Sequence, residues 1–270
     1  MRLFFLRFHQ VIVACLGFCL LASAACAESE PAATVSATDL AARLSAKQQD
    51  GSAYVRMRLQ TRGGAFQVQG KSRSTRGSTE VIYQVLWPKE RKGESVLLRR
   101  SGNGAASGAY FNPPNTTRSL DAGQLREPFF GSDLAYEDLI ENFFAWDQQS
   151  LVGTETVDNV PCQILESKPG KGGSSIYTSV RSWVDTRRMV PLRVEKYAGS
   201  GKLVRRIDTT RVVTDDKGRA IPANLTVRGP DGDSVTELNG GKITHAISFT
   251  DAEFTAEGIK QTVIPRGSPE

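Results

Sequence analysis

Short segments in which apolar and polar residues alternate recur along most of this chain, and a period of two is typical of half-buried β-strands. Residues 55–60 show the alternation clearly, and residues 80–87 repeat it with Val81, Tyr83 and Val85 on one face. The further strands that we expect are Ser95–Arg100, Ala109–Asn112, Leu151–Thr156, Cys162–Ser167, Tyr177–Asp185, Leu192–Tyr197, Leu203–Val213, Ile221–Val227, Ser234–Leu238 and Ile243–Phe249.

Short glycine-containing segments separate these predicted strands. They cover residues 102–104, 170–173, 199–201, 216–218 and 230–232, and each is short enough to be a hairpin loop. About eleven strands joined mainly by such loops predict a mainly β fold with a few helices, built on one large antiparallel sheet that is strongly curved or rolled into a partial barrel.

One face of this predicted sheet is apolar and needs a cover. Along residues 223–227, for example, every second side chain is apolar, and Asn224 and Thr226 between them are polar. The only helices that we expect are a short one near residues 36–44, capped by Ser36 or Thr38, and one at Ser132–Phe144. Two such helices are too little to fill the concave side of the sheet, which leaves either a second packed sheet or a cavity.

The predicted helix Ser132–Phe144 follows a pair of aromatic residues and a glycine at 129–131. Ser132 or Asp133 can cap its first turn, and Glu137 and Asp138 lie near the positive end of its dipole. We therefore interpret these three acidic residues as helix-start charges and not as a catalytic carboxylate cluster. The helix is either a plain plug of the sheet or a lid over an apolar ligand, and the paired phenylalanines favour the lid.

The first 27 residues have the pattern of a secretory signal peptide. Two arginines precede an apolar run at Val11–Leu21, and Ala25-Cys26-Ala27 is a typical cleavage site. The alternative is a lipoprotein anchored through Cys26. The apolar run of about 11 residues is too short for a membrane span, which needs about 20. We expect a flexible leader at 28–35, a single domain at 36–270 and a location in the periplasm.

Loss of the signal peptide leaves Cys162 as the last cysteine, so no internal disulfide is expected. Loss of Arg2 and Arg7 lowers the formal net charge from +5 to +3. Basic and acidic residues are interspersed and form no long basic run, which argues against a nucleic-acid partner and is weak evidence for contact with anionic lipid. We expect a monomer.

No enzyme motif is present in the chain. Cys162 and His245 could form a nucleophile pair, but both fall on predicted strands among apolar neighbours, where a buried thiol and a neutral histidine are the better interpretation. The glycines at 170–173 form a turn and not a phosphate loop. We expect no catalytic residue, no metal and no cofactor.

Several motifs resemble those of the bacterial outer-membrane lipoprotein-sorting proteins, the LolA-like family, whose fold is shared by LolA, LppX and RseB. They are Phe129–Leu139, Val160–Glu166, Ser182–Asp185, Val190–Tyr197 and Gly201–Leu203. The similarity extends in order from about Leu40 to Phe254, and Ala135 stands where relatives more often have phenylalanine or serine.

This resemblance implies an unclosed β-barrel whose concave apolar face is covered by helices and receives acyl chains. It also implies transport or sorting of lipids or lipoproteins towards the outer membrane, with a frequent partner in inner-membrane exporters of the resistance-nodulation-division type. The alternative is a sensor or adaptor that binds a protein partner. The predicted cavity residues are Val81, Tyr83, Val85, Tyr110, Phe129, Phe130, Leu134, Leu139, Phe143, Leu192, Val194 and Ile247.

Overall fold

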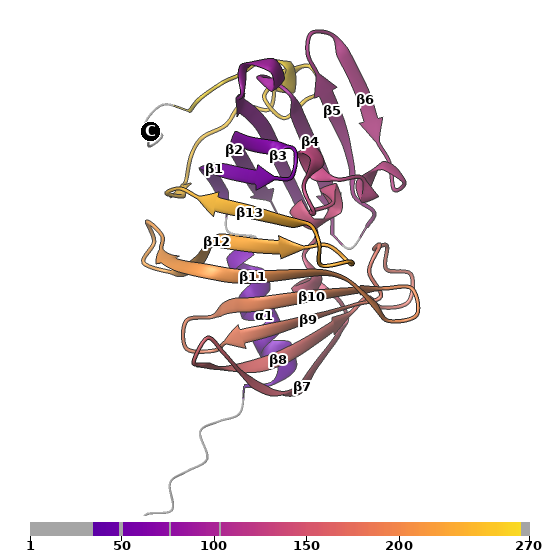
Figure 1. The fold of residues 1–270 in the computed structure, drawn as a ribbon, viewed down its shortest axis with the longest axis vertical. Helices are drawn as coiled ribbons and strands as arrows, with labels where there is room; N and C mark the ends of the chain where they lie inside the picture. Colours follow the sequence, from indigo (N-terminus) through magenta and orange to yellow (C-terminus); the bar gives the residue numbers. More distant parts are fainter. Residues whose placement is uncertain (1–34, 49–50, 76, 103, 266–270) are drawn as a thin grey trace, which may run out of the picture. The chain divides into compact units, whose positions relative to one another are not determined.

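A fourteen-stranded antiparallel sheet dominates the computed structural model, which describes residues 35–48, 51–75, 77–102 and 104–265 (Figure 1). The strand order is β6-β5-β4-β3-β2-β1-β13-β12-β11-β10-β9-β8-β7, and β14 also pairs with β1. The strands are β1 Ser52–Thr61, β2 Gly64–Thr75, β3 Ser78–Trp87, β4 Ser95–Ser101, β5 Ser107–Asn112, β6 Thr116–Leu120, β7 Gln148–Val157, β8 Val160–Lys168, β9 Ser179–Asp185, β10 Val190–Ala198, β11 Lys202–Thr214, β12 Ala220–Arg228, β13 Val235–Gly240 and β14 Thr244–His245.

The sheet consists of two meanders joined by the pairing of β1 with β13. Their far strands, β6 and β7, are the two edges, and they do not pair with each other. The predicted fold class, an unclosed half-barrel, is therefore confirmed. The predicted signal peptide, the anchor at Cys26 and all of the leader except Val35 lie outside the described residues.

Residues 121–147 connect the two edge strands, and we call this segment the cover. Because β6 and β7 lie at opposite edges of the sheet, the connection between them has to cross one whole face. The cover packs on the inner, concave face, which also carries α1, Ala37–Gln48 (Figure 1).

The predicted helix at Ser132–Phe144 is wrong. The cover holds only short 3-10 turns, which are η2 Gln124–Arg126, η3 Phe129–Gly131, η4 Tyr136–Leu139 and η5 Phe143–Ala145. Phe130 and Gly131 have positive φ angles of 49° and 82°. The Phe129 amide then donates to the Leu134 carbonyl at 2.7 Å, and a bridge joins Pro128 to Ala135, so this stretch folds back on itself before a helical ladder can form.

The first predicted helix is confirmed as α1. Ser36 caps it, because its Oγ accepts a hydrogen bond from the Asp39 amide at 3.1 Å. Leu40, Ala41 and Leu44 form its buried face. They belong to the helix cluster, which we define as Leu40, Ala41, Leu44, Phe143, Phe144, Trp146, Leu165, Tyr177, Val180, Val184 and Val194.

Three strand predictions need correction. β2 and β6 were not expected, and the predicted strand Ile243–Phe249 is a strand only at Thr244–His245. After β14 the chain turns onto the outer face of the sheet, where residues 246–265 form what we call the C-terminal segment. The apolar alternation of β2 is short and covers only Phe66 and Val68, and the strand buries the polar side chains of Gln69 and Lys71 under this segment.

Hydrogen bonds from buried glutamines hold the C-terminal segment on the outer face. Gln84 Nε2 donates to the carbonyls of Ile259 and Gln261 at 3.2 and 3.3 Å and to Ser95 Oγ at 2.9 Å. Gln69 Nε2 donates to the Val263 carbonyl at 3.3 Å. Apolar contacts add to this attachment, in the outer cluster of Ile82, Leu97, Phe111, Phe254 and Ile259.

Replacing Gln84 by alanine removes a donor that three acceptors share, two of them buried. We expect the free energy of unfolding to fall by about 2–3 kcal/mol, and we expect proteases to cleave the C-terminal segment more readily. Chemical denaturation and limited proteolysis measure the two effects. Gln67→Ala, at an exposed glutamine of β2, is the control; it should change the free energy of unfolding by less than about 0.5 kcal/mol.

Candidate functional site: the covered inner face

The cover fills the inner face of β1–β5 with aromatic side chains. Phe129 and Phe130 are 0% and 2% exposed, and their ring centroids lie 4.3 Å apart. The Phe129 ring meets the Tyr83 ring edge to face, with centroids 5.3 Å apart. We call the following residues the groove cluster: Leu59, Phe66, Val68, Val81, Val85, Val96, Leu98, Ala106, Leu120, Leu125, Phe129, Phe130, Leu134, Tyr136, Ile140 and Val227.

Ten of the twelve predicted cavity residues lie on the covered inner face. Val81, Val85, Phe129, Phe130 and Leu134 belong to the groove cluster, and Tyr83, Tyr110 and Leu139 pack against it. Phe143 and Val194 belong to the helix cluster. The other two lie apart: Leu192 packs with Val157, Cys162, Trp183 and Val190, and Ile247 is outside all four apolar clusters of the described residues.

A small cavity remains between the cover and the sheet. Its volume is about 270 Å³, and it lies beside the groove cluster, between β2, β3 and the end of α1. Its lining is mixed in polarity and consists of Gln48, Ser72, Ser74, Thr79, Val81, Tyr83, Asp138, Leu139, Ile140, Glu141 and Asn142. Ligand pockets usually measure about 300–1,000 Å³, so a long acyl chain fits here only if the cover moves.

A buried carboxylate attaches the middle of the cover to the second meander. Asp138 accepts a hydrogen bond from Lys196 Nζ at 2.6 Å, and their side chains are 1% and 2% exposed. Arg205 and the Tyr177 hydroxyl also donate to it, and it caps the Ala135 amide at 2.7 Å. Burial by itself would raise the pKa of Asp138, but Lys196 and Arg205 outweigh burial and hold the pKa below its ordinary value.

A second set of buried charges attaches the cover to β4. Arg100 Nη2 lies 3.2 Å from Glu137 Oε1 and 3.8 Å from Glu141 Oε1. No hydrogen bond within the described residues reaches either carboxylate oxygen of Glu141, whose side chain is fully buried. Burial therefore raises the pKa of Glu141 to about 7; Glu137 adds to this effect, whereas the positive charges of Lys196 and Arg100 oppose it.

A third contact joins the cover to β13. The backbone N–H of Asp133 donates to Thr236 Oγ1 at 2.9 Å, and the Asp133 carboxylate accepts from the hydroxyls of Thr236 and Ser234. Each of the three acidic residues that we had interpreted as helix-start charges thus holds the cover to the sheet. That interpretation is wrong because the helix does not form, although Asp138 does cap η4.

One sequence signal could have revealed the buried ion pair. On β10, Val190, Leu192 and Val194 are followed at the same spacing by Lys196. A lysine in a run of buried positions needs a buried carboxylate as its partner, because an unpaired ammonium group is costly to bury. The partner itself lies 58 residues away in the chain, and the sequence does not single it out.

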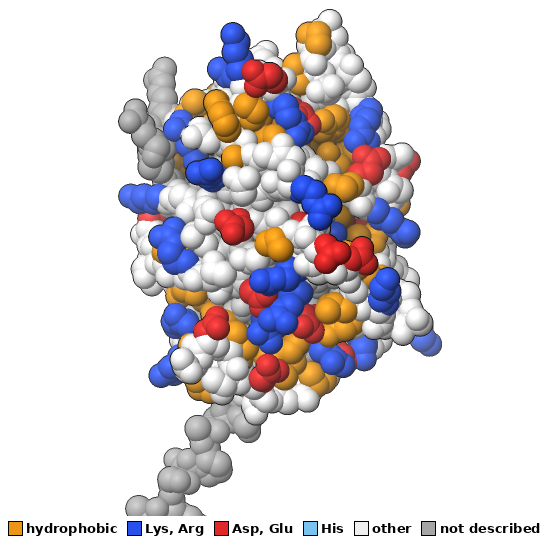
Figure 2. All heavy atoms as spheres, in the orientation of Figure 1, with side chains coloured by type: hydrophobic (Ala, Val, Ile, Leu, Met, Phe, Trp, Pro, Cys, Tyr) orange, Lys and Arg blue, Asp and Glu red, His pale blue; other side chains and the backbone are white. Residues whose placement is uncertain are grey.

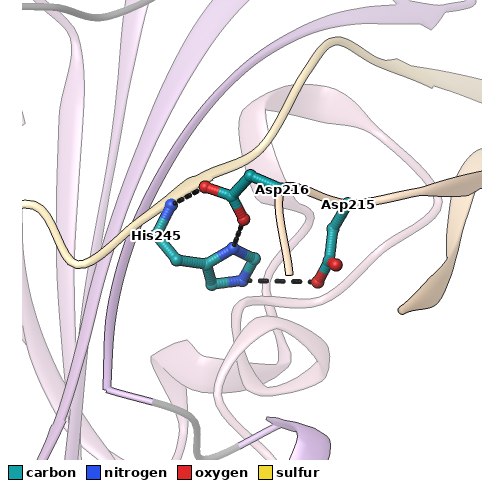
Figure 3. Close-up of side chains that lie close together, drawn as sticks. All are labelled: Asp215, Asp216 and His245. Carbon is teal, nitrogen blue, oxygen red and sulfur yellow. Dashed lines mark hydrogen bonds and ion pairs between the residues drawn. The ribbon is translucent and has the colours of Figure 1, made fainter. Parts of the chain in front are cut away.

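Asp215, Asp216 and His245 are the one group of potential metal ligands within the described residues (Figure 3). The His245 ring bonds to Asp216 through Nδ1, and its Nε2 lies 3.8 Å from Asp215 Oδ2. Arg219 already donates to Asp215 and lies 3.0 Å from His245 Nε2. A metal ion would have to displace this guanidinium group, so we interpret the cluster as a structural ion pair.

Cys162 is a buried free thiol and is not hydrogen-bonded to His245. Its Sγ lies 3.5 Å from the Val160 carbonyl, and burial raises the pKa of the thiol. A thiol with a raised pKa is a poor nucleophile at neutral pH.

Among the described residues, no helix is both long and apolar enough to span a membrane.

A model of a family of uncharacterized proteins matches residues 77–261, which is more than half of the chain. The chain belongs to this family. No curated protein matches it significantly.

Solved structures show the fold. A DUF1329 family protein from Desulfovibrio piger ATCC 29098 is 22% identical, with a TM-score of 0.73 over 81% of this chain and 95% of that one. A putative outer membrane lipoprotein-sorting protein domain from Vibrio parahaemolyticus is 20% identical, with a TM-score of 0.74 over 83% and 98%. The LolA superfamily protein NE2245 from Nitrosomonas europaea is 19% identical, with a TM-score of 0.62 over 82% and 98%. The resemblance to LolA-like proteins is confirmed for the fold.

Glu141 predicts a pH-dependent stability. Its pKa of about 7 in the folded protein exceeds the ordinary value of 4.5, so the folded state binds a proton more tightly than the unfolded state between these values. We therefore expect the free energy of unfolding to fall as the pH rises from about 4.5 to about 7, by on the order of 3 kcal/mol, and to level off above.

Glu141→Gln should remove this fall and stabilise the protein at pH 8, as measured by urea denaturation at several pH values. Glu257→Gln, at a side chain that is 82% exposed, is the control and should leave the fall in place. An unchanged pH profile in Glu141→Gln would show that another group causes it.

Proposed function

We propose that this protein carries lipids or lipoproteins by taking their acyl chains into the inner face of its half-barrel beneath a movable cover. One observation supports the proposal above all: the inner face of β1–β5 is apolar, yet the segment that closes it has no regular helix or strand and meets the sheet through separate side-chain contacts. Such a segment can move without breaking a backbone ladder.

In this proposal the cargo takes the place of Phe129, Phe130 and Leu134. Burial of such a side chain contributes about 1.5–3 kcal/mol, so moving three of them costs at most about 9 kcal/mol. An acyl chain of 16 carbons gains on the order of 12 kcal/mol at about 0.8 kcal/mol per CH2. Association has costs of its own, and so a cargo with two or three chains is favoured over a single fatty acid.

The fold shared with a LolA superfamily protein and with a putative lipoprotein-sorting domain supports the same function. We propose that the protein works in the periplasm, moves its cargo towards the outer membrane and receives it from an inner-membrane exporter of the resistance-nodulation-division type. Catalysis is not part of the proposal.

A disulfide between the cover and β13 tests whether the cover must move. The Asp133 amide lies 2.9 Å from Thr236 Oγ1, and the two side chains are hydrogen-bonded. With an N–Cα bond of about 1.5 Å, the two Cα atoms fall within the roughly 6.8 Å that a disulfide spans. We therefore expect the double substitution Asp133→Cys/Thr236→Cys, with all other cysteines replaced by serine, to form a disulfide.

The oxidised variant should lose at least tenfold in affinity for a fluorescent diacyl lipid, and reduction should restore binding. Thr226→Cys/Glu237→Cys joins two residues that lie opposite each other on β12 and β13, and it is the matched control. Equal lipid binding by the oxidised and reduced forms of the first variant would disprove the movement of the cover.

A phenylalanine substitution tests whether cargo and cover compete for one place. Phe130→Ala should lower the free energy of unfolding by about 3–5 kcal/mol. It should also raise the affinity for the diacyl lipid by on the order of tenfold, because the cargo no longer displaces a buried ring. Phe254→Ala, in the outer cluster, should cost similar stability and leave the affinity unchanged. If Phe130→Ala also leaves the affinity unchanged, the cargo does not occupy this place.

A further inference from the structure

The last residue of β3 carries an exposed aromatic side chain. Trp87 is 53% exposed, more than any other large apolar side chain of the described residues. The other two tryptophans of the chain, Trp146 and Trp183, are only 8% and 6% exposed. The function proposed above gives the Trp87 ring no role.

Two exposed lysines flank this tryptophan. Lys89 and Lys92 project from the connection between β3 and β4, with Glu90 as the only exposed acidic residue in it. The turn between β1 and β2 reaches the same end of the sheet, because Gln67 pairs with Trp87. It adds exposed Arg62, whose Nη2 donates to the carbonyl of exposed Asp233 in the β12–β13 turn. The β5–β6 turn lies beside Gly93, where an added Cβ would come within 3.3 Å of Pro113 Cγ, and it carries no charge. Figure 2 shows Lys and Arg side chains at this upper end of the described chain.

Side-chain contacts of Arg91 fix the conformation of the β3–β4 connection. Arg91 is turned inward: its Nε and Nη2 bond to the Glu94 carboxylate at 2.5 and 2.7 Å, and its guanidinium lies 4.6 Å from the centre of the Phe66 ring. Arg91 Nη1 also donates to the Phe130 carbonyl of the cover at 3.3 Å. These contacts of Arg91 fix the connection that carries the exposed lysines next to Trp87. One of them also joins the connection to the cover.

We propose that this end of the sheet, through Trp87, Lys89 and Lys92, docks onto the surface of an anionic lipid bilayer. A tryptophan ring suits the interface between headgroups and acyl chains, because its body is apolar and its N–H is polar. Lysines beside it attract anionic headgroups. A protein partner is the less favoured occupant, because exposed Lys89 and Lys92 follow the ring in the chain.

Docking would place the bilayer next to Phe130, where the cover is linked to Arg91. Acyl chains could then pass between the bilayer and the inner face over a short path. This consequence rests on the proposed carrier function, whereas the docking itself does not.

Co-sedimentation with vesicles tests the docking. We expect the protein to bind vesicles of phosphatidylcholine with 30% phosphatidylglycerol, to bind pure phosphatidylcholine far less, and to lose binding as salt rises. Since Trp87 is the only exposed tryptophan, its emission should shift to the blue, and acrylamide should quench it less when vesicles are added.

Trp87→Ala should weaken vesicle binding on the order of tenfold and abolish the blue shift. Lys89→Gln/Lys92→Gln should weaken binding on the order of 20-fold, since each basic residue near an anionic surface contributes roughly fivefold. Lys171→Gln/Lys202→Gln makes the same change in net charge at two exposed lysines elsewhere, and Leu203→Ala removes another exposed apolar side chain. Both controls should bind vesicles normally, and every variant keeps the same N-terminal residues.

The docking proposal would be overturned if the protein did not bind anionic vesicles. It would also be overturned if Lys89→Gln/Lys92→Gln and Lys171→Gln/Lys202→Gln lost binding equally, or if the Trp87 emission did not shift when the protein bound vesicles. Uptake of the diacyl lipid from detergent, measured without vesicles, separates the two proposals. Normal uptake of the diacyl lipid without binding to vesicles would disprove only the docking proposal. Binding to vesicles without uptake of the lipid would disprove only the carrier function.

Discussion

The ion pair between Asp138 and Lys196 is the interaction on which the arrangement of the inner face depends. It joins the cover to β10 at a point where both side chains are almost fully buried. In the chain Asp138 stands between Tyr136 and Ile140 of the groove cluster, and Lys196 Nζ lies over the Phe143 and Tyr177 rings of the helix cluster, so the pair links the two apolar regions. Removing one member would leave the other charged and buried, which is far more costly than losing an exposed ion pair.

Topology is the reason that such a buried pair exists. The edge strands β6 and β7 are consecutive in the chain but lie at opposite ends of the sheet, so their connection has to cross the inner face. A connection this long leaves many backbone groups without a ladder partner, and side chains supply the attachment instead. Asp133, Glu137 and Asp138 provide it towards β13, β4 and β10, respectively.

Both faces of the half-barrel are covered, but in different ways. On the outer face, Gln69 and Gln84 bond to the backbone of the C-terminal segment, and apolar packing adds to the attachment. On the inner face, the cover is held by ion pairs and contains a carboxylate, Glu141, that burial leaves without a hydrogen bond. Because a buried carboxylate without a hydrogen bond lowers stability, the attachment of the cover is less stable than that of the C-terminal segment. This agrees with movement of the cover and not of the C-terminal segment.

The sequence by itself determined the sheet, its antiparallel connections and the capped helix α1, because alternation, glycine turns and Ser36 act over a few residues. It also identified Phe129, Phe130 and Leu134 as residues that pack on the inner face. Only the tertiary structure decided the conformation of the cover: the contacts that keep residues 132–144 from forming a helix come from strands that are distant in the chain, as Asp133 with Thr236 and Asp138 with Lys196 show. β2 was missed because its apolar alternation covers only Phe66 and Val68; its buried polar residues Gln69 and Lys71 find their partners in the C-terminal segment, nearly 200 residues away.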